Sequence, residues 1–257
     1  MRASGAVTRS TLRQQIADAL RDEVLSGRLQ PGREFTVKQI AEQYGVSATP
    51  VREALFDLSA QGLLESDQHR GFRVHQFSVA DYRAMVEART LVMDGVIRDV
   101  FREQPPSPSP SPERQARYRE ALVSVRRRAD EAARAARGGD LDILIGYDLR
   151  FWRELGALAG NAYIGDFLHR LRVQAWVFAV PYLRGDADVR DWLWQGHSDL
   201  VAAVTLRDRE ALRAVVDHYN GHALNWADRL AAGDPDHLGH APPPGAEEAP
   251  DPAGPEA

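Results

Sequence analysis

Between residues 11 and 75, apolar residues change from helical spacing to strand-like alternation, and few small folds satisfy that order. Three segments have the helical spacing, and each ends at a glycine: Gly27, Gly45 and Gly62. A tight turn separates the second segment from the third. Two short strand-like stretches follow at 63–66 and 72–75, and the second of them alternates between apolar and polar residues. Helix, helix, turn, helix and a two-stranded wing predict a winged helix-turn-helix domain over residues 11–76.

From residue 78 onward the helical spacing continues without convincing alternation. Residues 78–232 are therefore expected to form an all-α antiparallel helical bundle, which makes the predicted fold class mainly α. Five prolines within residues 104–112 predict an exposed loop. Residues 1–10 lack periodicity and predict a flexible arm. Residues 233–257 are rich in Pro, Gly, Ala and acids, and they predict a disordered acidic tail.

Polar residues mark the expected starts of the bundle helices. Asp140 follows two glycines and is expected to cap one helix, and Asn161 is expected to cap the next. A further single helix is expected from Asp188 to about Leu206.

Composition excludes several kinds of site and partner. The chain has no cysteine, which removes disulfides, thiol nucleophiles and cysteine-ligated metal sites. No apolar run approaches the ~18–20 residues of a membrane span, and no signal-peptide pattern begins the sequence, so a cytoplasmic location is expected. The net charge is −5, but six acids follow Gly233 with no Lys or Arg, which leaves residues 1–232 at +1. A nucleic-acid partner is compatible with that charge.

The most specific motif is Gly-Val-Ser-Ala-Thr-Pro-Val-Arg-Glu-Ala-Leu at residues 45–55. Leu-Gln-Pro-Gly precedes it at 29–32, and Arg-Gly-Phe-Arg-Val follows it at 70–74. With this spacing, residues 11–75 resemble the DNA-binding domain of the GntR family of bacterial transcription regulators. The helical region is similar, more loosely, to the FadR-type sensing domain known as FCD; the matching residues are Glu87, Arg89, Asp148, Phe151, Asn161, His197 and Asp208.

The resemblance implies a homodimer that binds a double-stranded, palindromic DNA operator. The positions that would face DNA are Lys38, Ser47, Ala48, Thr49, Arg52, His69, Arg70 and Gly71. An arginine can bond guanine O6 and N7 together, whereas Lys, Ser and Thr suit phosphate oxygens. Many relatives carry arginine where Ala48 stands, so one base contact is expected to be lost. The alternative for Arg52 is an ion pair with Glu53 or Asp57, and His69 could be a plain turn residue.

Many sensing domains of this type hold a divalent metal with one Asp and three His, and the resemblance places Trp152 and Tyr219 at two of those His positions. Asp148 and His197 keep theirs. A metal-free pocket is therefore expected, lined by the two aromatic residues. The alternative is a reduced site for zinc, nickel or manganese made of Asp148, His197 and His222, which lies three residues after Tyr219. A third interpretation treats Trp152, Tyr219 and His197 as ordinary core.

Arg89 matches an arginine that faces the effector in related domains, and its planar guanidinium suits a carboxylate ligand. The alternative is a surface ion pair with Glu87 or Asp94. The candidate effector site is then Arg89, Asp148, Trp152, His197, Tyr219 and His222.

These observations predict a ligand-responsive regulator, a repressor that a small carboxylic acid effector releases from its operator, rather than an enzyme. Two alternatives stay open. One is a DNA-binding regulator whose helical domain only dimerises, and the other is a metal-dependent enzyme built on Asp148, His197 and His222.

Overall fold

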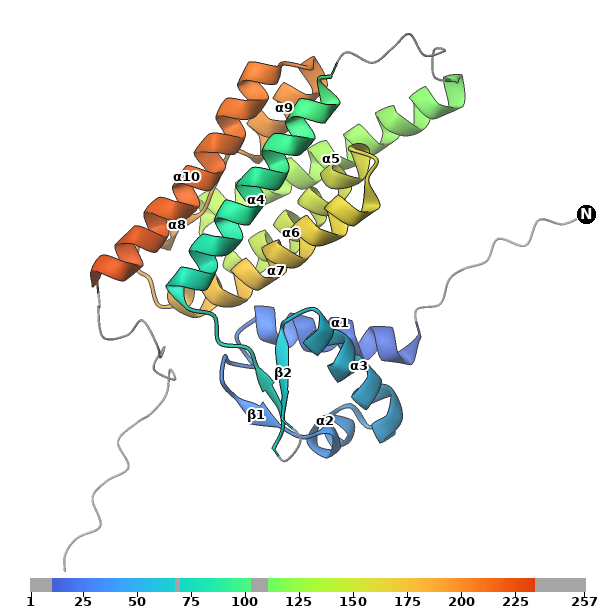
Figure 1. The fold of residues 1–257 in the computed structure, drawn as a ribbon, viewed down its shortest axis with the longest axis vertical. Coiled ribbons are helices and arrows are strands. Elements are labelled where there is room, and N and C mark those ends of the chain that lie inside the picture. Colours follow the sequence, from blue (N-terminus) through green and yellow to red (C-terminus); the bar gives the residue numbers. More distant parts are fainter. Residues whose placement is uncertain (1–10, 68–69, 103–110, 234–257) are drawn as a thin grey trace, which may run out of the picture.

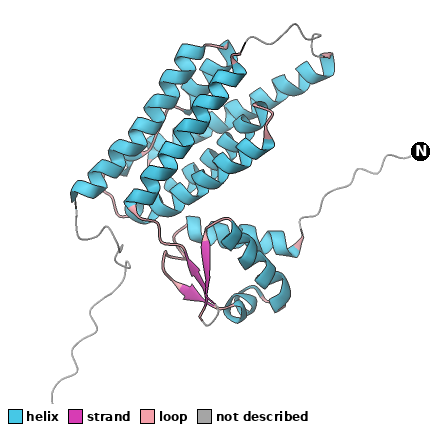
Figure 2. Cartoon of the chain, viewed as in Figure 1, coloured by secondary structure: helices cyan, strands magenta, loops and turns pink. Residues whose placement is uncertain are grey.

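The computed structural model describes residues 11–67, 70–102 and 111–233, and it places a small domain beside one end of a bundle of long helices (Figure 1). The predicted arm, His69, most of the proline-rich loop and nearly all of the predicted tail lie outside the described residues. Within the described part of the chain, every strand belongs to the small domain (Figure 2). The predicted fold class, a winged helix followed by a helical bundle, is confirmed.

The small domain combines three helices with a three-stranded sheet. Its helices are α1 (Leu12–Leu25), α2 (Val37–Tyr44) and α3 (Ala48–Ala60), and its strands are β1 (Glu34–Phe35), β2 (Leu64–Asp67) and β3 (Gly71–Val74). The strand order is β1-β3-β2, with both pairs antiparallel. Thr36 begins α2 with a capping box, and Gly45 ends it in the left-handed conformation. β1 was not predicted, because two residues are too few to show alternation.

The bundle begins at Ser78, which starts α4 (Val79–Val100) with a second capping box. The other bundle helices are α5 (Pro112–Gly138), α6 (Leu141–Leu158), α7 (Ala162–Arg184), α8 (Val189–Trp192), α9 (His197–Leu206) and α10 (Arg209–Gly233). The side chains of Asp140 and Asn161 cap α6 and α7, as predicted. None of the described helices has the length and apolar character that crossing a membrane requires.

The single helix expected from Asp188 to Leu206 is wrong, because residues 193–196 divide it into α8 and α9. Leu193 has extended backbone angles. The ring of Trp194 folds back onto Gly196, where an added Cβ would lie 2.7 Å from the indole. This turn brings Trp194 into the bundle, where it is buried.

Buried apolar side chains form two clusters in the described residues. One cluster, called the lower cluster here, runs from the small domain into the half of the bundle beside it and includes Leu20, Leu55 and Val86. The upper cluster fills the far half of the bundle and includes Phe151 and Leu200. Polar side chains occupy the level between the two clusters, and they form one of the candidate sites below.

Helix α7 connects the bundle to the small domain. It packs against α1, and the side-chain amide of Gln174 donates a hydrogen bond of 2.8 Å to the backbone oxygen of Gln61, the residue that ends α3. At the C-terminal end of α7, Arg184 packs against Gly27 of the small domain. A displacement of α7 would therefore act directly on the end of α3.

Replacing Gly71 with alanine is expected to destabilise the wing. Its φ angle is +99°, and a Cβ there would lie 2.6 Å from the carbonyl oxygen of Phe35. Gly71→Ala should push β1 away from β3 and lower the free energy of unfolding by about 1–3 kcal/mol. Urea denaturation measures this loss. Gly95→Ala on α4, where a Cβ would meet no atom, is the control and should change stability by less than about 1 kcal/mol. Equal stability of Gly71→Ala and wild type would contradict this wing geometry.

Candidate functional site

The first candidate site is the exposed surface at the start of α3. The opposite face of this helix is buried in the small domain through Val51, Ala54, Leu55 and Leu58. Ser47, Ala48, Thr49 and Arg52 are exposed at its start, and Glu53 and Phe56 are exposed beside them. Ser47 occupies the cap position, although its side chain makes no capping hydrogen bond. Four of the residues predicted to face DNA therefore share one accessible surface.

Arg52 is exposed, and none of the described residues forms an ion pair with it. Asp57, one of its alternative partners, instead lies 3.3 Å from Nε of Arg13. Lys38 on α2 is also exposed, with its ammonium 3.8 Å from a carboxylate oxygen of Glu42. Both cations are thus accessible to the phosphates and bases of a duplex.

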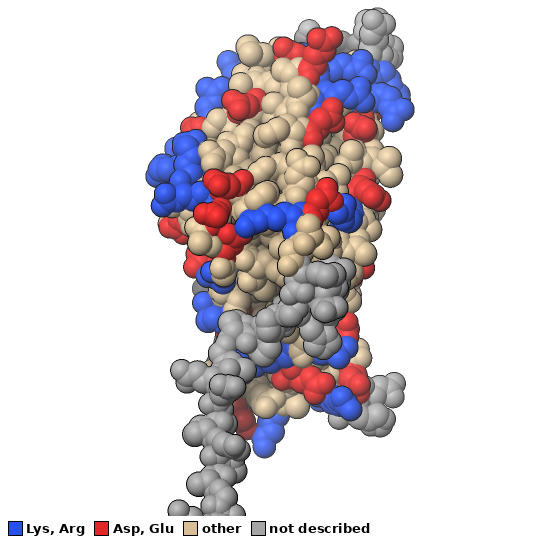
Figure 3. Space-filling model, turned by 90° about the vertical axis from the view of Figure 1, so that its left-hand side faces the viewer, with Lys and Arg blue, Asp and Glu red and all other residues tan. Residues whose placement is uncertain are grey.

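The wing contributes Arg70 and Gly71 to the same domain. The side chain of Arg70 is 71% exposed, and its guanidinium lies 3.6 Å from Glu34 of β1. Such an exposed pair contributes little to stability and leaves the arginine accessible. The face of the molecule seen in Figure 3 carries basic and acidic side chains intermixed over the bundle.

The second candidate site is a layer of polar side chains in the middle of the bundle. Its members are Arg89 on α4, Asp148 on α6, Arg172 on α7, His197 on α9, and Tyr219 and Asn220 on α10. All except Tyr219 are buried. On α4, for example, Val86 belongs to the lower apolar cluster and Met93 to the upper one, with Arg89 between them. Burying so many polar groups is costly unless they are paired, which makes this polar layer a candidate functional site.

Asp148 is well supplied with hydrogen-bond donors. Its Oδ1 lies 2.9 Å from Nε2 of His197 and 3.0 Å from the indole nitrogen of Trp152, and its Oδ2 lies 2.8 Å from that of Trp176. Burial alone would raise the pKa of Asp148, but the hydrogen bond from His197, the charge of Arg172 and the hydrogen bond from Trp176 lower that pKa below its usual value. Asp148 is therefore an ionised carboxylate that orients three ring nitrogens.

The two arginines of the polar layer have no carboxylate partner among the described residues. Arg89 donates from Nε to Oδ1 of Asn220 at 2.9 Å and from Nη1 to the Tyr219 hydroxyl at 3.0 Å. Arg172 lies over the ring of Trp152, at 3.8 Å from Cζ to the centroid, and its Nε is 3.5 Å from the same hydroxyl. Nη2 of each arginine is buried without a partner in the described structure.

The surface ion pair considered for Arg89 is wrong. Arg89 is only 3% exposed, whereas Glu87 is exposed on the same helix. Asp94, the other alternative partner, instead lies 3.5 Å from Arg213 of α10. Arg89 is therefore a buried cation that faces the interior of the bundle.

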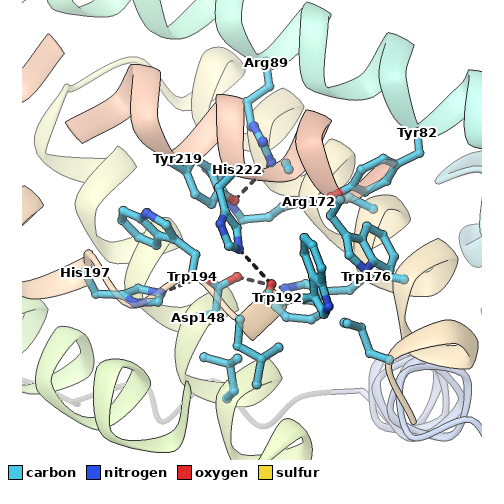
Figure 4. A pocket seen from close by; sticks show the side chains of 17 residues that line it. Tyr82, Arg89, Asp148, Arg172, Trp176, Trp192, Trp194, His197, Tyr219 and His222 are labelled. Atoms are coloured by element: carbon cyan, nitrogen blue, oxygen red, sulfur yellow. Dashed lines mark hydrogen bonds and ion pairs between the residues drawn. The ribbon is translucent and has the colours of Figure 1, made fainter. Parts of the chain in front are cut away.

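These side chains line one pocket between the helices (Figure 4). Its polar wall consists of Arg89, Asp148, Arg172, His197, Tyr219 and His222. Its other walls combine alanine and leucine side chains with five aromatic ones, Tyr82, Trp176, Trp192, Trp194 and Trp226. An apolar cavity with a few convergent polar groups is the usual form of a small-molecule site.

Trp152 departs from the prediction that it lines this pocket. It lies behind Arg172 and lines a separate apolar cavity together with Met93, Leu168 and Leu200. Its indole nitrogen supports Asp148, and its ring supports the guanidinium of Arg172. Trp152 thus positions polar-layer residues without facing the pocket itself.

The alternative three-ligand metal site is not assembled. His222 turns its Nε2 to the backbone oxygen of Trp192, at 2.9 Å, instead of joining Asp148 and His197. Both oxygens of Asp148 are taken by ring nitrogens. In the described part of the chain, no group of three His, Cys, Asp or Glu side chains could hold a metal ion. The residues present therefore do not fit a divalent metal.

Sequence reasoning missed several residues of the pocket, above all Arg172 and Trp176 on α7. A signal was available, because Arg172 shares the apolar face of a helix with Leu168 and Trp176 at spacings of four. Trp194 was missed for another reason: only the break before α9 turns it into the bundle.

Comparisons with known proteins agree with this architecture. The model of the bacterial regulatory proteins of the gntR family matches residues 12–74, and the FCD-domain model matches residues 112–221. The "Probable D-xylose utilization operon transcriptional repressor" of Paenarthrobacter nicotinovorans is 27% identical over 216 residues, 84% of this chain and 88% of the relative. The repressor RspR of Escherichia coli K12 is 28% identical over 207 residues, 80% of this chain and 84% of the relative.

Solved structures show the same fold. Escherichia coli McbR/YncC has a TM-score of 0.66 at 21% identity and covers 86% of this chain and 99% of its own. A GntR-type structure from Rhodococcus sp. RHA1 has a TM-score of 0.59 at 18% identity, and the match covers 86% of this chain and 98% of that one. A winged helix joined to an effector-binding bundle, with relatives that regulate transcription, defines a DNA-binding transcription regulator. The chain belongs to the GntR family, in the group whose DNA-binding domain is followed by an FCD domain.

Proposed function

We propose that the protein is a cytoplasmic repressor that leaves its operator when a small carboxylic acid occupies the pocket of the bundle. The observation that carries this proposal is Arg89, a buried cation with no carboxylate partner and an unpartnered Nη2 among the described residues. A buried charge without a counter-charge is costly, so an anionic ligand is its natural complement. Two relatives are described as transcriptional repressors, which supports the direction of the response.

DNA binding would use α3 and the wing of two subunits, one on each half of a palindrome. Two-fold protein symmetry and two half-sites about one helical turn apart belong together in this kind of domain. Light scattering of the full chain should then give roughly twice the 28.5 kDa of one subunit. Footprinting on the promoter of its own operon should protect both half-sites. A strict monomer at micromolar concentration would contradict this part of the proposal.

An alternative regulator, whose bundle only dimerises, is separated from the proposed one by a thermal-shift assay with organic acids. A ligand that binds only the folded protein raises the melting temperature by mass action. The proposed function therefore requires at least one acid that stabilises the protein. The unpartnered guanidinium nitrogens favour a ligand, because a bundle that merely dimerises has no use for them.

Helix α7 supplies a physical connection between the pocket and the DNA-binding domain. Arg172 and Trp176 line the pocket from α7, and Gln174 lies between them in sequence. The amide of Gln174 is bonded to the end of α3, the helix proposed to read DNA. A ligand that changes the position of Arg172 would bias the same helix that holds α3, which is how one site can influence another.

Gln174→Ala is expected to weaken the response to acid while sparing both binding events. Its amide touches neither the pocket nor the exposed face of α3, so acid and DNA affinities should stay close to wild type. The shift in DNA affinity caused by acid should shrink, since contacts on such a path carry roughly 0.5–2 kcal/mol of coupling. Fluorescence anisotropy with and without acid measures it. Arg170→Ala, exposed on α7, is the control. An unchanged acid response in Gln174→Ala would exclude this route.

A further inference from the structure

The charges of the polar layer do not balance. Arg89 and Arg172 are two buried cations, and Asp148 is the only buried carboxylate among the described residues. His197 gives Asp148 a hydrogen bond through Nε2, and its Nδ1 is buried without a partner in the described structure. A protonated Nδ1 would be an unpaired buried donor, so we assign the neutral imidazole. The layer then carries one uncompensated positive charge.

The two guanidinium groups lie close to each other. Both have a nitrogen within 3.5 Å of the Tyr219 hydroxyl, and that oxygen is the only hydrogen-bond partner that they share in the described residues. Burial lowers the pKa of Arg172, and the nearby positive charge of Arg89 lowers it further. The charged form of Arg172 is therefore disfavoured as long as no anion lies between the two groups. Both arginines line the same pocket, and each has a buried Nη2 that bonds to nothing in the described structure.

We propose that the pocket binds a monocarboxylic acid with an aromatic body, and that Arg172 holds its carboxylate jointly with Arg89. The proposal rests on the proposed function and makes it more specific. One carboxylate matches the single uncompensated charge and supplies acceptors for the unpartnered Nη2 atoms. A dicarboxylate would replace one excess positive charge by one excess negative charge in a buried site.

The remaining walls of the pocket select the body of the ligand. Tyr82, Trp176, Trp192 and Trp226 line it along with alanine and leucine side chains. Flat aromatic groups gain from contact with such rings in offset or edge-to-face arrangements, beyond the area that they bury. The indole nitrogens of Trp192 and Trp194 are buried without a partner in the described structure, so these walls can satisfy an acceptor or two on the ligand body. Further polar groups on that body would lose their water without gaining partners.

Calorimetry on the full-length protein tests the proposal with phenylacetate, 3-phenylpropionate and indole-3-acetate as probes. At least one should bind. Its neutral amide should bind about 10- to 100-fold more weakly, since hydrogen bonds to charged groups are lost. Phenylmalonate, which adds a second carboxylate to phenylacetate, should also bind more weakly than phenylacetate. Arg172→Met should weaken the acid about 10- to 100-fold, and Arg170→Met, exposed on the same helix, should leave its affinity unchanged.

The thermal midpoint measured without ligand separates a loss of ligand binding from a loss of protein stability. Arg172→Met removes the uncompensated charge, so its thermal midpoint without acid should equal or exceed that of wild type, whereas the upward shift produced by acid should be lost. Acid binding that ignores Arg172 but needs Arg89 would overturn this inference and leave the proposed function intact. Preferential binding of dicarboxylates would also overturn this inference without contradicting the proposed function. Failure of every acid, aromatic or aliphatic, would overturn both.

Discussion

Arg52→Ala is expected to abolish specific operator binding while leaving the protein folded. Arg52 is exposed at the start of α3, and none of the described residues competes for its guanidinium through an ion pair. A bidentate contact with guanine contributes about 1–3 kcal/mol of discrimination per half-site, and a symmetric dimer loses it twice. Specific affinity should fall by roughly 100-fold or more, toward the non-specific level. Fluorescence anisotropy with operator and scrambled duplexes measures both affinities.

Two further variants separate base reading from general attraction to DNA. Lys38→Ala should weaken operator and scrambled DNA alike and reduce the salt dependence, because a phosphate contact carries no sequence information. Arg150→Ala, exposed on α6 in the bundle, should change neither. If Arg52→Ala keeps the wild-type ratio of operator affinity to scrambled-duplex affinity, Arg52 does not read bases.

Arg89→Met is expected to remove acid binding and, with it, the response of DNA binding to acid. Arg89 already donates to Asn220 and Tyr219, and its remaining Nη2 has no partner in the described structure. Losing two hydrogen bonds to a carboxylate, worth about 3 kcal/mol together, corresponds to roughly 100-fold weaker binding. Calorimetry measures the loss. Operator affinity without acid should remain that of wild type, since Arg89 is buried in the bundle.

The matched control for Arg89→Met is Arg98→Met, which removes an exposed arginine from the same helix. It should leave acid binding, DNA binding and the acid response unchanged. If Arg89→Met binds acid as tightly as wild type, the carboxylate sits elsewhere and the arrangement proposed for the pocket is wrong.

The winged helix was predictable because short-range rules determine it. The side chain of Thr36 caps α2, Gly45 ends α2 in the left-handed conformation, and Ser47 occupies the cap position of α3. Each of these preferences acts within a few residues, so it is visible in the sequence. Strand β1 was not predicted from the sequence, because its pairing with β3 is a long-range contact of only two residues.

The polar layer was predictable only in part, because it is assembled from helices far apart in the chain. Resemblance supplied Arg89, Asp148 and His197, and the structure brings all three to one pocket. It did not supply Arg172, whose importance lies in sharing a phenol oxygen with Arg89 across the bundle. No spacing within α7 reveals that contact.

The alternative metal site of Asp148, His197 and His222 shows the limit of spacing arguments. His222 lies one helical turn beyond Tyr219, so helix geometry alone allowed it to replace a ligand there. The backbone oxygen of Trp192, the last residue of α8, lies 2.9 Å from Nε2 of His222 and is its partner instead. That carbonyl became available only through the break between α8 and α9, which periodicity did not show.

Anisotropy of a labelled operator duplex, titrated with an aromatic monocarboxylate at fixed protein concentration, tests the central claim most directly. The account predicts that wild type is released from the operator as the acid saturates the pocket, and that Arg89→Met stays bound at the same acid concentrations. Release of both proteins alike, or of neither while calorimetry shows the acid bound to wild type, would contradict the claim that this pocket controls DNA binding.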